Sequence, residues 1–313
     1  MLARAVLMLG LILLPSTSAI IHPPGSLTEM DLTVGDAGTV LYEEITATWC
    51  EICSLIDPLL EEVDHRQGSR MHRVALHPVG SDPLGTSASQ HRIDRIADRT
   101  AYSNSTPAHI LDGDLIGEGG DMELLSTVQR GVLERETARG QSTDLRLTVG
   151  SEDGGDLRIE TEARVLDRAD ASMITLMVTQ NQIQVEGNVH QRVLIGLIEV
   201  DVTTLNVTAD HLPEAWRPAS TDIDVEEDVM RIELSIQNGI ENIDDLGFLV
   251  VHERVNADPS GATVLGVASL DQRDLKGGED RGAGFGVGLL IALGLASAVM
   301  PAWASRLDRK EAE

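Results

Sequence analysis

A change in hydrophobic periodicity near Gly140 limits most strongly what this chain can fold into. Before it, from about residue 36, the apolar residues alternate between the period typical of strands and the spacing typical of helices. The expected elements, in chain order, are a strand over 40–47, a helix over 50–67, a strand over 71–77, a helix over 90–99, strands over 108–111 and 115–117, and a helix over 121–139. This order predicts an α/β layer fold for a first domain over 26–140.

After Gly140 the pattern is typical of strands alone. Apolar and polar residues alternate in short runs that begin near residues 145, 157, 173, 192, 230, 247 and 263, and no convincing helix lies between them. About seven short strands in roughly 130 residues are typical of a sandwich of two sheets. We therefore expect a second, all-β sandwich domain of the immunoglobulin or fibronectin type over 141–271.

The two ends of the chain predict export and a membrane anchor. Residues 1–19 combine a short positive start, an apolar run and small residues before a cleavage point, as a signal peptide does. Residues 282–304 contain no charged side chain and are long enough to cross a bilayer as one helix. A charged linker over 272–281 precedes this segment and a tail over 305–313 follows it. Arg306, Arg309 and Lys310 lie after the segment, against Lys276 and Arg281 before it, which favours a cytoplasmic tail. These features predict a single-pass protein of the cell membrane, with the lipid bilayer as a partner, most of the chain outside and the tail in the cytoplasm.

The charge and the cysteine count limit the possible functions. The formal net charge is −27, which disfavours nucleic acid as a partner because its phosphates would be repelled. Cys50 and Cys53 are the only two cysteines. A disulfide across two residues closes almost no loop, so it would stabilise the fold little and serve better as a redox switch. At the start of a helix, Cys50 would be favoured as a thiolate by free N–H groups, although the neighbouring Glu51 carboxylate opposes this.

The segment from Trp49 to Cys53 (WCEIC), with Pro58 five residues after the second cysteine, resembles the active-site helix of the thioredoxin superfamily. Ser105-Thr-Pro107, before the strand that begins at residue 108, is similar to the cis-proline loop of that family. The resemblance covers roughly residues 36–140, and a cell-surface thioredoxin-like protein with a C-terminal β-domain is a weaker likeness. The dipeptide Glu51-Ile52 differs from those of well-known members, so no redox potential is implied.

The resemblance implies an extracytoplasmic thiol–disulfide oxidoreductase that needs no cofactor and no metal. Its partners would be protein substrates that contain cysteines and a membrane-bound or soluble redox partner. The implied roles are an attacking thiolate at Cys50, a resolving thiol at Cys53, a proton acceptor at Glu44, a wall of the site at Trp49, and a substrate-pairing loop at Thr106 and Pro107. From the same family we expect a cis peptide bond between Thr106 and Pro107.

Two alternatives remain open from the sequence. The chain would instead be a cell-surface binding protein if the first domain were only a scaffold for the sandwich. The two cysteines with His77 or His109 would bind copper or zinc, but no further soft ligand is evident. The direction of electron flow, the substrate and the use of the glycosylation sequences at Asn104 and Asn206 do not follow from the sequence.

Overall fold

The computed structural model describes residues 32–35, 38–138, 143–151, 157–165, 171–213, 218–226, 229–236, 245–255 and 263–271. All of them belong to one compact unit, Gly25–Asp274. The elements of the first half are β1 (Leu32–Gly35), β2 (Val40–Ile45), α1 (Glu51–Gln67), the 3-10 turn η1 (Gly68–Arg70), β3 (Met71–Leu76), α2 (Ser87–Arg99), β4 (Ala108–Leu111), β5 (Asp114–Glu118) and α3 (Met122–Ala138). The described elements of the second half are β6 (Thr143–Ser151), β7 (Leu157–Val165), β8 (Ser172–Gln180), β9 (Ile183–Val185), β10 (Asn188–His190), β11 (Val193–Asp201), β12 (Val207–His211), β13 (Pro218–Glu226), β14 (Val229–Ile236), β15 (Leu246–Arg254) and β16 (Val264–Asp271).

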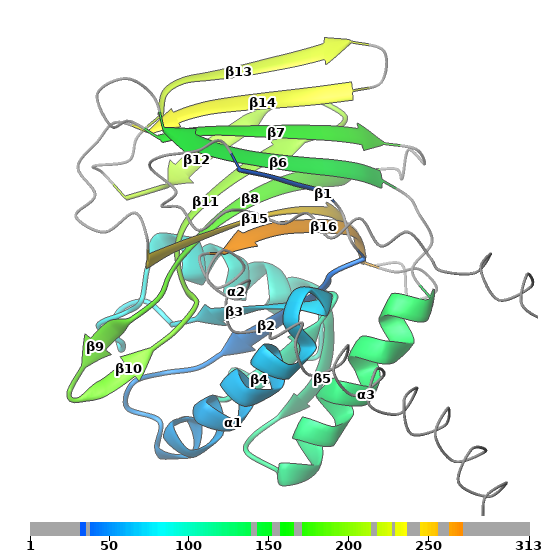
Figure 1. The fold of residues 1–313 in the computed structure, drawn as a ribbon. Coiled ribbons are helices and arrows are strands. Elements are labelled where there is room, and N and C mark those ends of the chain that lie inside the picture. Colours follow the sequence, from blue (N-terminus) through cyan, green and yellow to red (C-terminus); the bar gives the residue numbers. More distant parts are fainter. Residues whose placement is uncertain are drawn as a thin grey trace, which may run out of the picture. The chain divides into compact units, whose positions relative to one another are not determined.

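The strands of both halves form one mixed sheet of nine strands (Figure 1). Its order is β16-β15-β8-β11-β3-β2-β4-β5, and β12 pairs with β11 beside this path. The two halves join where β11 lies parallel to β3, with Val193 opposite Ala75. The Ala75 amide also donates a hydrogen bond of 2.8 Å to the carbonyl of Arg192. A second sheet has the order β1-β6-β7-β14-β13, so β1 from the start of the chain completes a sheet of the second half.

The expected fold class, an α/β thioredoxin-like domain followed by a separate all-β sandwich and a C-terminal transmembrane helix, is therefore wrong. The physical reason lies at β3, since β2 covers one edge of this strand and leaves its other edge free to pair. Strand β11 takes that edge, so strands assigned to the sandwich continue the first sheet. Within the described residues no helix is long and apolar enough to cross a membrane. The segments expected to be a signal peptide (1–19), a transmembrane helix (282–304) and a tail (305–313) lie outside those residues.

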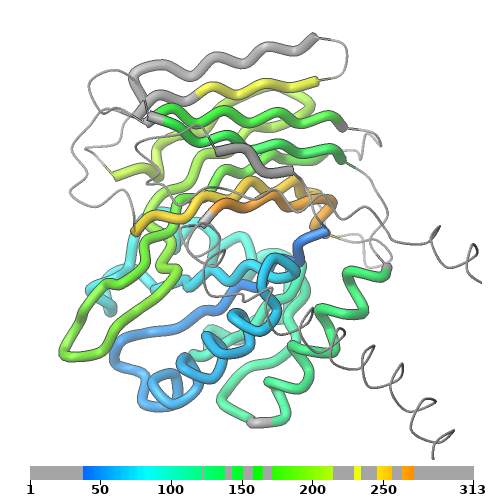
Figure 2. Tube along the Cα trace, viewed as in Figure 1, coloured from blue at the N-terminus to red at the C-terminus, as the bar shows by residue number. Residues whose placement is uncertain are grey.

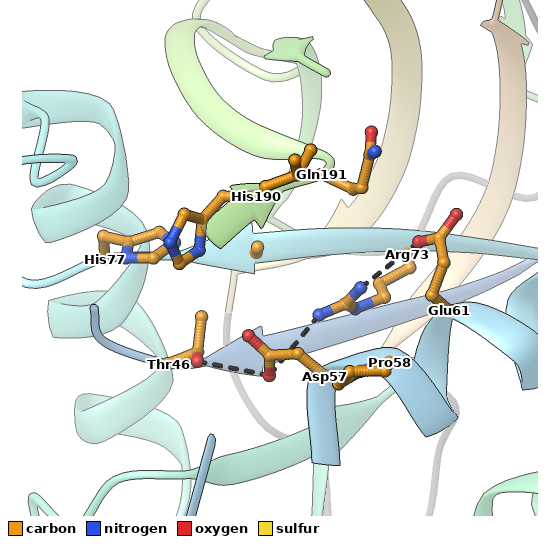
Figure 3. A pocket seen from close by; sticks show the side chains of 10 residues that line it. Thr46, Asp57, Pro58, Glu61, Arg73, His77, His190 and Gln191 are labelled. Carbon is orange, nitrogen blue, oxygen red and sulfur yellow. Dashed lines mark hydrogen bonds and ion pairs between the residues drawn. The ribbon is translucent and has the colours of Figure 1, made fainter. Parts of the chain in front are cut away.

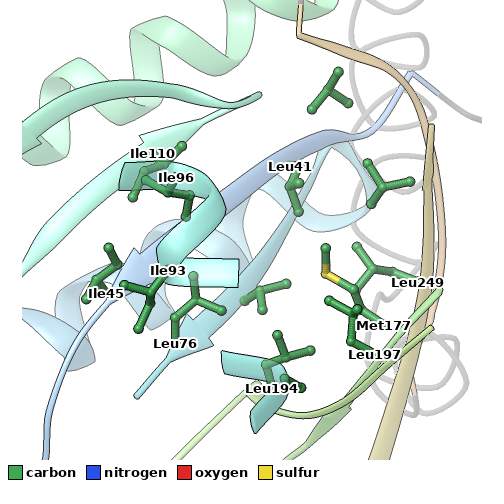
Figure 4. Packing of buried hydrophobic residues seen from close by; sticks show 14 of the residues in the cluster. Leu41, Ile45, Leu76, Ile93, Ile96, Ile110, Met177, Leu194, Leu197 and Leu249 are labelled. Atoms are coloured by element: carbon green, nitrogen blue, oxygen red, sulfur yellow. The ribbon is translucent and has the colours of Figure 1, made fainter. Parts of the chain in front are cut away.

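The helices cover both faces of the sheet around β2. Side chains alternate between the two faces of a strand, and on β2 they divide accordingly. Leu41 and Ile45 pack with Ile93 and Ile96 of α2, in a cluster that also includes residues of β8, β11 and β15 (Figure 4). Tyr42 packs on the other face with α1 and α3. Helix α1, which begins at the cysteine pair, therefore lies on the face opposite α2.

A buried ion cluster ties α2 to the second half of the chain. The Arg92 guanidinium is fully buried and pairs with Glu43 of β2 and Glu253 of β15. Arg99 pairs with the same Glu253 at 3.2 Å. An unpaired charge in such a place would cost several kcal/mol, so each partner requires the others. The cluster therefore fixes α2 against β2 and β15.

Candidate functional site around the cysteine pair

The two cysteines lie at the start of α1. Strand β2 ends at Ile45, and a short turn leads to Cys50, which is the N-cap of the helix with an extended backbone. Its Sγ accepts a hydrogen bond of 3.1 Å from the Cys53 amide. The first N–H groups of a helix have no partner inside the helix, so the sulfur at this position receives one of them. The same contact would stabilise a thiolate on Cys50.

Cys50 and Cys53 are joined by a disulfide bond. Cys50 is 8% exposed and Cys53 is 0% exposed, so the order of exposure is the one expected for an attacking and a resolving thiol. Two apolar side chains beside them are open to solvent: Trp49 is 56% exposed and Ile52 is 49% exposed. Cys50 is therefore the less buried of the two cysteines and lies next to two exposed apolar side chains.

The loop that contains Thr106 and Pro107 lies against the disulfide. The carbonyl oxygen of Thr106 is 3.8 Å from Cys50 Sγ. The Thr106–Pro107 peptide bond is cis, as the sequence predicted. The Gly119 amide donates a hydrogen bond of 2.7 Å to the Pro107 carbonyl, which ties this loop to the end of β5. The structure thus brings together Cys50, Cys53 and Thr106, which are far apart in sequence.

Glu44, the acid expected from the sequence, is completely buried on β2. Its Oε2 atom accepts hydrogen bonds of 2.6 and 3.0 Å from the Arg73 guanidinium on β3. Its Oε1 atom is buried and makes no hydrogen bond within the part of the chain that is described. One oxygen of the Glu44 carboxylate is therefore occupied by its ion pair with Arg73.

Asp57 was missed by the sequence analysis. It lies on α1 four residues after Cys53, and its Oδ1 atom is 3.7 Å from Arg73. Thr46 donates a hydrogen bond of 3.5 Å to the same oxygen. The pKa of Asp57 is raised to about 7, chiefly by burial and next by the negative charge of Glu44, against which the Arg73 charge lowers it. The available signal was the spacing, because residues four apart on a helix share one face.

A cavity of about 230 Å³ lies beside this acid (Figure 3). The residues that line it are Thr46, Asp57, Pro58, Glu61, Arg73, Ala75, His77, Val189, His190 and Gln191. Three of them come from the end of the β9–β10 hairpin and the turn after it, which extends from the large sheet beside α1 (Figure 2). The cavity is thus built by both halves of the chain.

Two histidines form the wall opposite Asp57. The rings of His77 and His190 meet edge to face, with centroids 5.6 Å apart. Their Nε2 atoms are buried and make no hydrogen bond to the residues that the structure describes. Burial, and next the charge of His77, lower the pKa of His190. An imidazole nitrogen at this position can accept or donate a proton within the cavity.

Asp82 fixes the turn that precedes Cys50. It accepts hydrogen bonds from the amides of Thr48, at 2.6 Å, and Leu84, at 2.8 Å. His77 Nδ1 lies 3.2 Å from the same carboxylate. The turn that carries Trp49 is therefore held to the loop after β3, which limits the positions that Cys50 can take.

The histidines considered as metal ligands are used otherwise. His109 Nδ1 is 2.7 Å from the Tyr42 hydroxyl, and its Nε2 is 3.2 Å from the Gly119 carbonyl oxygen. Over the described ranges, no group of three or more His, Cys, Asp or Glu side chains is placed to hold a metal ion. The arrangement around Cys50 is suited to thiol–disulfide exchange, in which the reacting groups are sulfur atoms.

No family model and no curated protein matched the chain. Among solved structures, it is similar to HBP35 of Porphyromonas gingivalis, with 13% sequence identity and a TM-score of 0.55 over 74% of each chain. At this identity the likeness concerns the fold alone.

Proposed function

We propose that this protein is a thiol–disulfide oxidoreductase that exchanges disulfides with cysteine-containing proteins through Cys50 and Cys53. The observation that carries the proposal is the disulfide at the start of α1, with the Thr106 carbonyl oxygen 3.8 Å from Sγ of Cys50, the less buried of the two cysteines. The resemblance of these segments to the thioredoxin superfamily is part of the proposal. Glu44, Trp49, Thr106 and Pro107 are proposed as the surrounding functional residues.

The proposed reaction has two steps. When the protein acts as a reductant, the Cys50 thiolate attacks a substrate disulfide, and one substrate sulfur leaves as a thiolate. Cys53 then loses its proton and attacks Cys50 Sγ, which forms the Cys50–Cys53 disulfide and releases the second substrate thiolate. Two electrons pass from the protein to the substrate, and the reverse sequence oxidises a substrate dithiol.

The loop beside the cysteines is the proposed binding segment for the substrate. An extended peptide can add to a backbone segment that presents free N–H and C=O groups. The segment around Thr106 lies against Cys50 Sγ, so a substrate strand bound there would place its sulfur next to the attacking atom. The exposed Trp49 and Ile52 supply apolar contact area for the residues around the substrate disulfide.

The test is to capture the covalent intermediate. Cys53→Ser should accumulate mixed disulfides through Cys50, since the resolving attack is lost, whereas Cys50→Ser should accumulate almost none. The measurement is non-reducing electrophoresis and mass spectrometry after mixing each reduced variant with intact insulin, whose two chains are joined by disulfides. Equal capture by both variants would mean that the roles are wrong. Absence of capture, with a Cys50 pKa near the ~8.5 of a free thiol, would favour a binding protein without redox activity.

A further inference from the structure

We propose that Asp57 accepts the proton of Cys53 when Cys53 attacks the mixed disulfide, and that the neighbouring cavity returns this proton to solvent. In this assignment Glu44 is a positioning residue whose charge makes Asp57 more basic. The inference rests on the proposed function and names the catalytic base of that site.

The first support is the place of Asp57 on α1. Cys53 and Asp57 are four residues apart, so their Cβ atoms lie about 5–6 Å from each other on one face of the helix. Cys53 is 0% exposed and packs with Ala47 and Cys50, so its proton has no direct route to bulk water. Thr46, beside Ala47, hydrogen-bonds Asp57. The acid is thus on the inner side of the cysteine pair, where a base for Cys53 is required.

The second support is the different state of the two acids. One oxygen of Glu44 accepts two hydrogen bonds from the Arg73 guanidinium, whereas Asp57 Oδ1 is 3.7 Å from the same group. When two acids share one cation, the closer one keeps its charge and the other is more easily protonated. Asp57 therefore exchanges a proton near neutral pH, in the range in which a thiol must lose one.

The third support is the route to solvent. Asp57 lines the cavity, whereas Glu44 does not, and the facing wall carries the imidazoles of His77 and His190, whose Nε2 atoms are buried. The charged or titratable groups around Asp57 are Glu44 and Tyr42 on β2, Arg73 on β3, Glu61 on α1, His77 after β3, His109 on β4 and His190 on β10. A proton on Asp57 can leave through this polar wall, which a base enclosed behind Arg73 would not allow.

The Cys53 thiol gives its proton to the Asp57 carboxylate, and an electron pair of Cys53 Sγ forms the bond to Cys50 Sγ. The bond between Cys50 and the substrate sulfur breaks, and the substrate leaves as a thiolate. Asp57 then loses its proton to the cavity, so the protein dithiol is oxidised and the substrate disulfide is reduced.

The test follows the two steps separately in the full chain. Reduced protein is mixed with 5,5′-dithiobis(2-nitrobenzoate) in a stopped-flow instrument from about pH 5.5 to about pH 9, a range that spans the titration of Asp57 and of a free thiol. The first release of the coloured thiolate reports attack by Cys50, and the second, independent of reagent concentration, reports attack by Cys53. In the wild type the second rate should rise with pH around 7.

Asp57→Asn should slow the second release about tenfold or more at pH 7–8 and move its pH midpoint toward that of a free thiol, with the first release unchanged. A merely electrostatic role gives the opposite sign, because removal of a neighbouring negative charge lowers the thiol pKa and speeds the attack. Glu62→Gln is the matched control, since Glu62 is an acid on the same helix that pairs with Arg66 and does not line the cavity. It should keep the wild-type second rate and midpoint.

Glu44→Gln separates the two acids. It should keep a fast second release and move its midpoint to lower pH, since the charge that makes Asp57 basic is gone. The assignment is overturned if Asp57→Asn keeps the wild-type rate and midpoint, or if Glu44→Gln loses the second release while Asp57→Asn keeps it. A wild type that gives no second release would instead contradict the proposed function, so the two failures are distinguishable.

Discussion

Replacement of Asp57 by Asn should stabilise the folded protein, and by more at pH 8 than at pH 5. The pKa of this acid is raised from 3.8 to about 7, chiefly by burial and next by the charge of Glu44. A carboxyl with a raised pKa binds its proton more tightly in the folded state than in the unfolded state. The wild type therefore loses stability as the pH rises from about 4 to about 7. An amide has no proton to lose, so the variant avoids this loss.

The size of the effect follows from the difference between the folded and unfolded pKa values. A tenfold change in proton affinity corresponds to about 1.36 kcal/mol, so raising the pKa from 3.8 to about 7 costs about 4 kcal/mol once the folded acid is ionised. At pH 5, which is not far above the unfolded pKa, only about 1.5–2 kcal/mol of this cost has accumulated. The gain from Asp57→Asn should therefore be about 2–3 kcal/mol larger at pH 8 than at pH 5. The attraction to Arg73 is already contained in the pKa of about 7, because it acts only on the ionised carboxylate and lowers the pKa that burial would otherwise give.

The assay is urea unfolding of the oxidised wild type and variant at both pH values, with the free energy of unfolding extrapolated to water. Glu61→Gln is a control for removing a carboxylate from Arg73 at a more exposed position, and it should show a smaller dependence on pH. A change in the free energy of unfolding that is equal at pH 5 and pH 8 would refute the reasoning. So would a variant that is destabilised more at pH 8, since Asp57 would then be stabilised as an ion.

Two further changes test the frame around the site. Glu253→Gln should lower the free energy of unfolding by about 3–5 kcal/mol in urea titrations, because Arg92 would keep a buried and partly unpaired charge. Burial alone would raise the pKa of Glu253, but the Arg92 charge brings it well below its usual value. The stabilisation that ionised Glu253 gives to the wild type should therefore be lost as the pH falls below about 4. A loss below about 1 kcal/mol at pH 7 would contradict the ion cluster. Gly120→Ala should destabilise by about 1–3 kcal/mol and slow disulfide exchange, because its Cβ would meet the Ile52 side chain at 2.1 Å. The added change Ile52→Ala should restore the free energy of unfolding, and no rescue would mean that this contact is not the cause.

The local parts of the structure follow from the sequence because their causes are local. The helix after Cys50 and the strands around residues 40, 71 and 108 lie close to the expected positions, since hydrophobic period and turn residues act over a few positions. The pairing of β11 with β3 was not predictable in this way. It joins Val193 to Ala75, and nothing near either residue specifies that partner. The same limit hid the contact of Arg92 with Glu253, which are separated by 161 residues.

The candidate site likewise contains parts that follow from local sequence motifs and parts that depend on distant segments. The sulfur pair and the Thr106–Pro107 loop could be proposed from motifs, because each motif is continuous in the sequence. Asp57 could not, because its properties come from β3 on one side and the β9–β10 hairpin on the other. A hairpin supplied by the second half of the chain closes the cavity over an acid supplied by the first. The union of the two halves in one sheet, which made the expected fold class wrong, therefore also creates the environment in which Asp57 can act as a base near neutral pH.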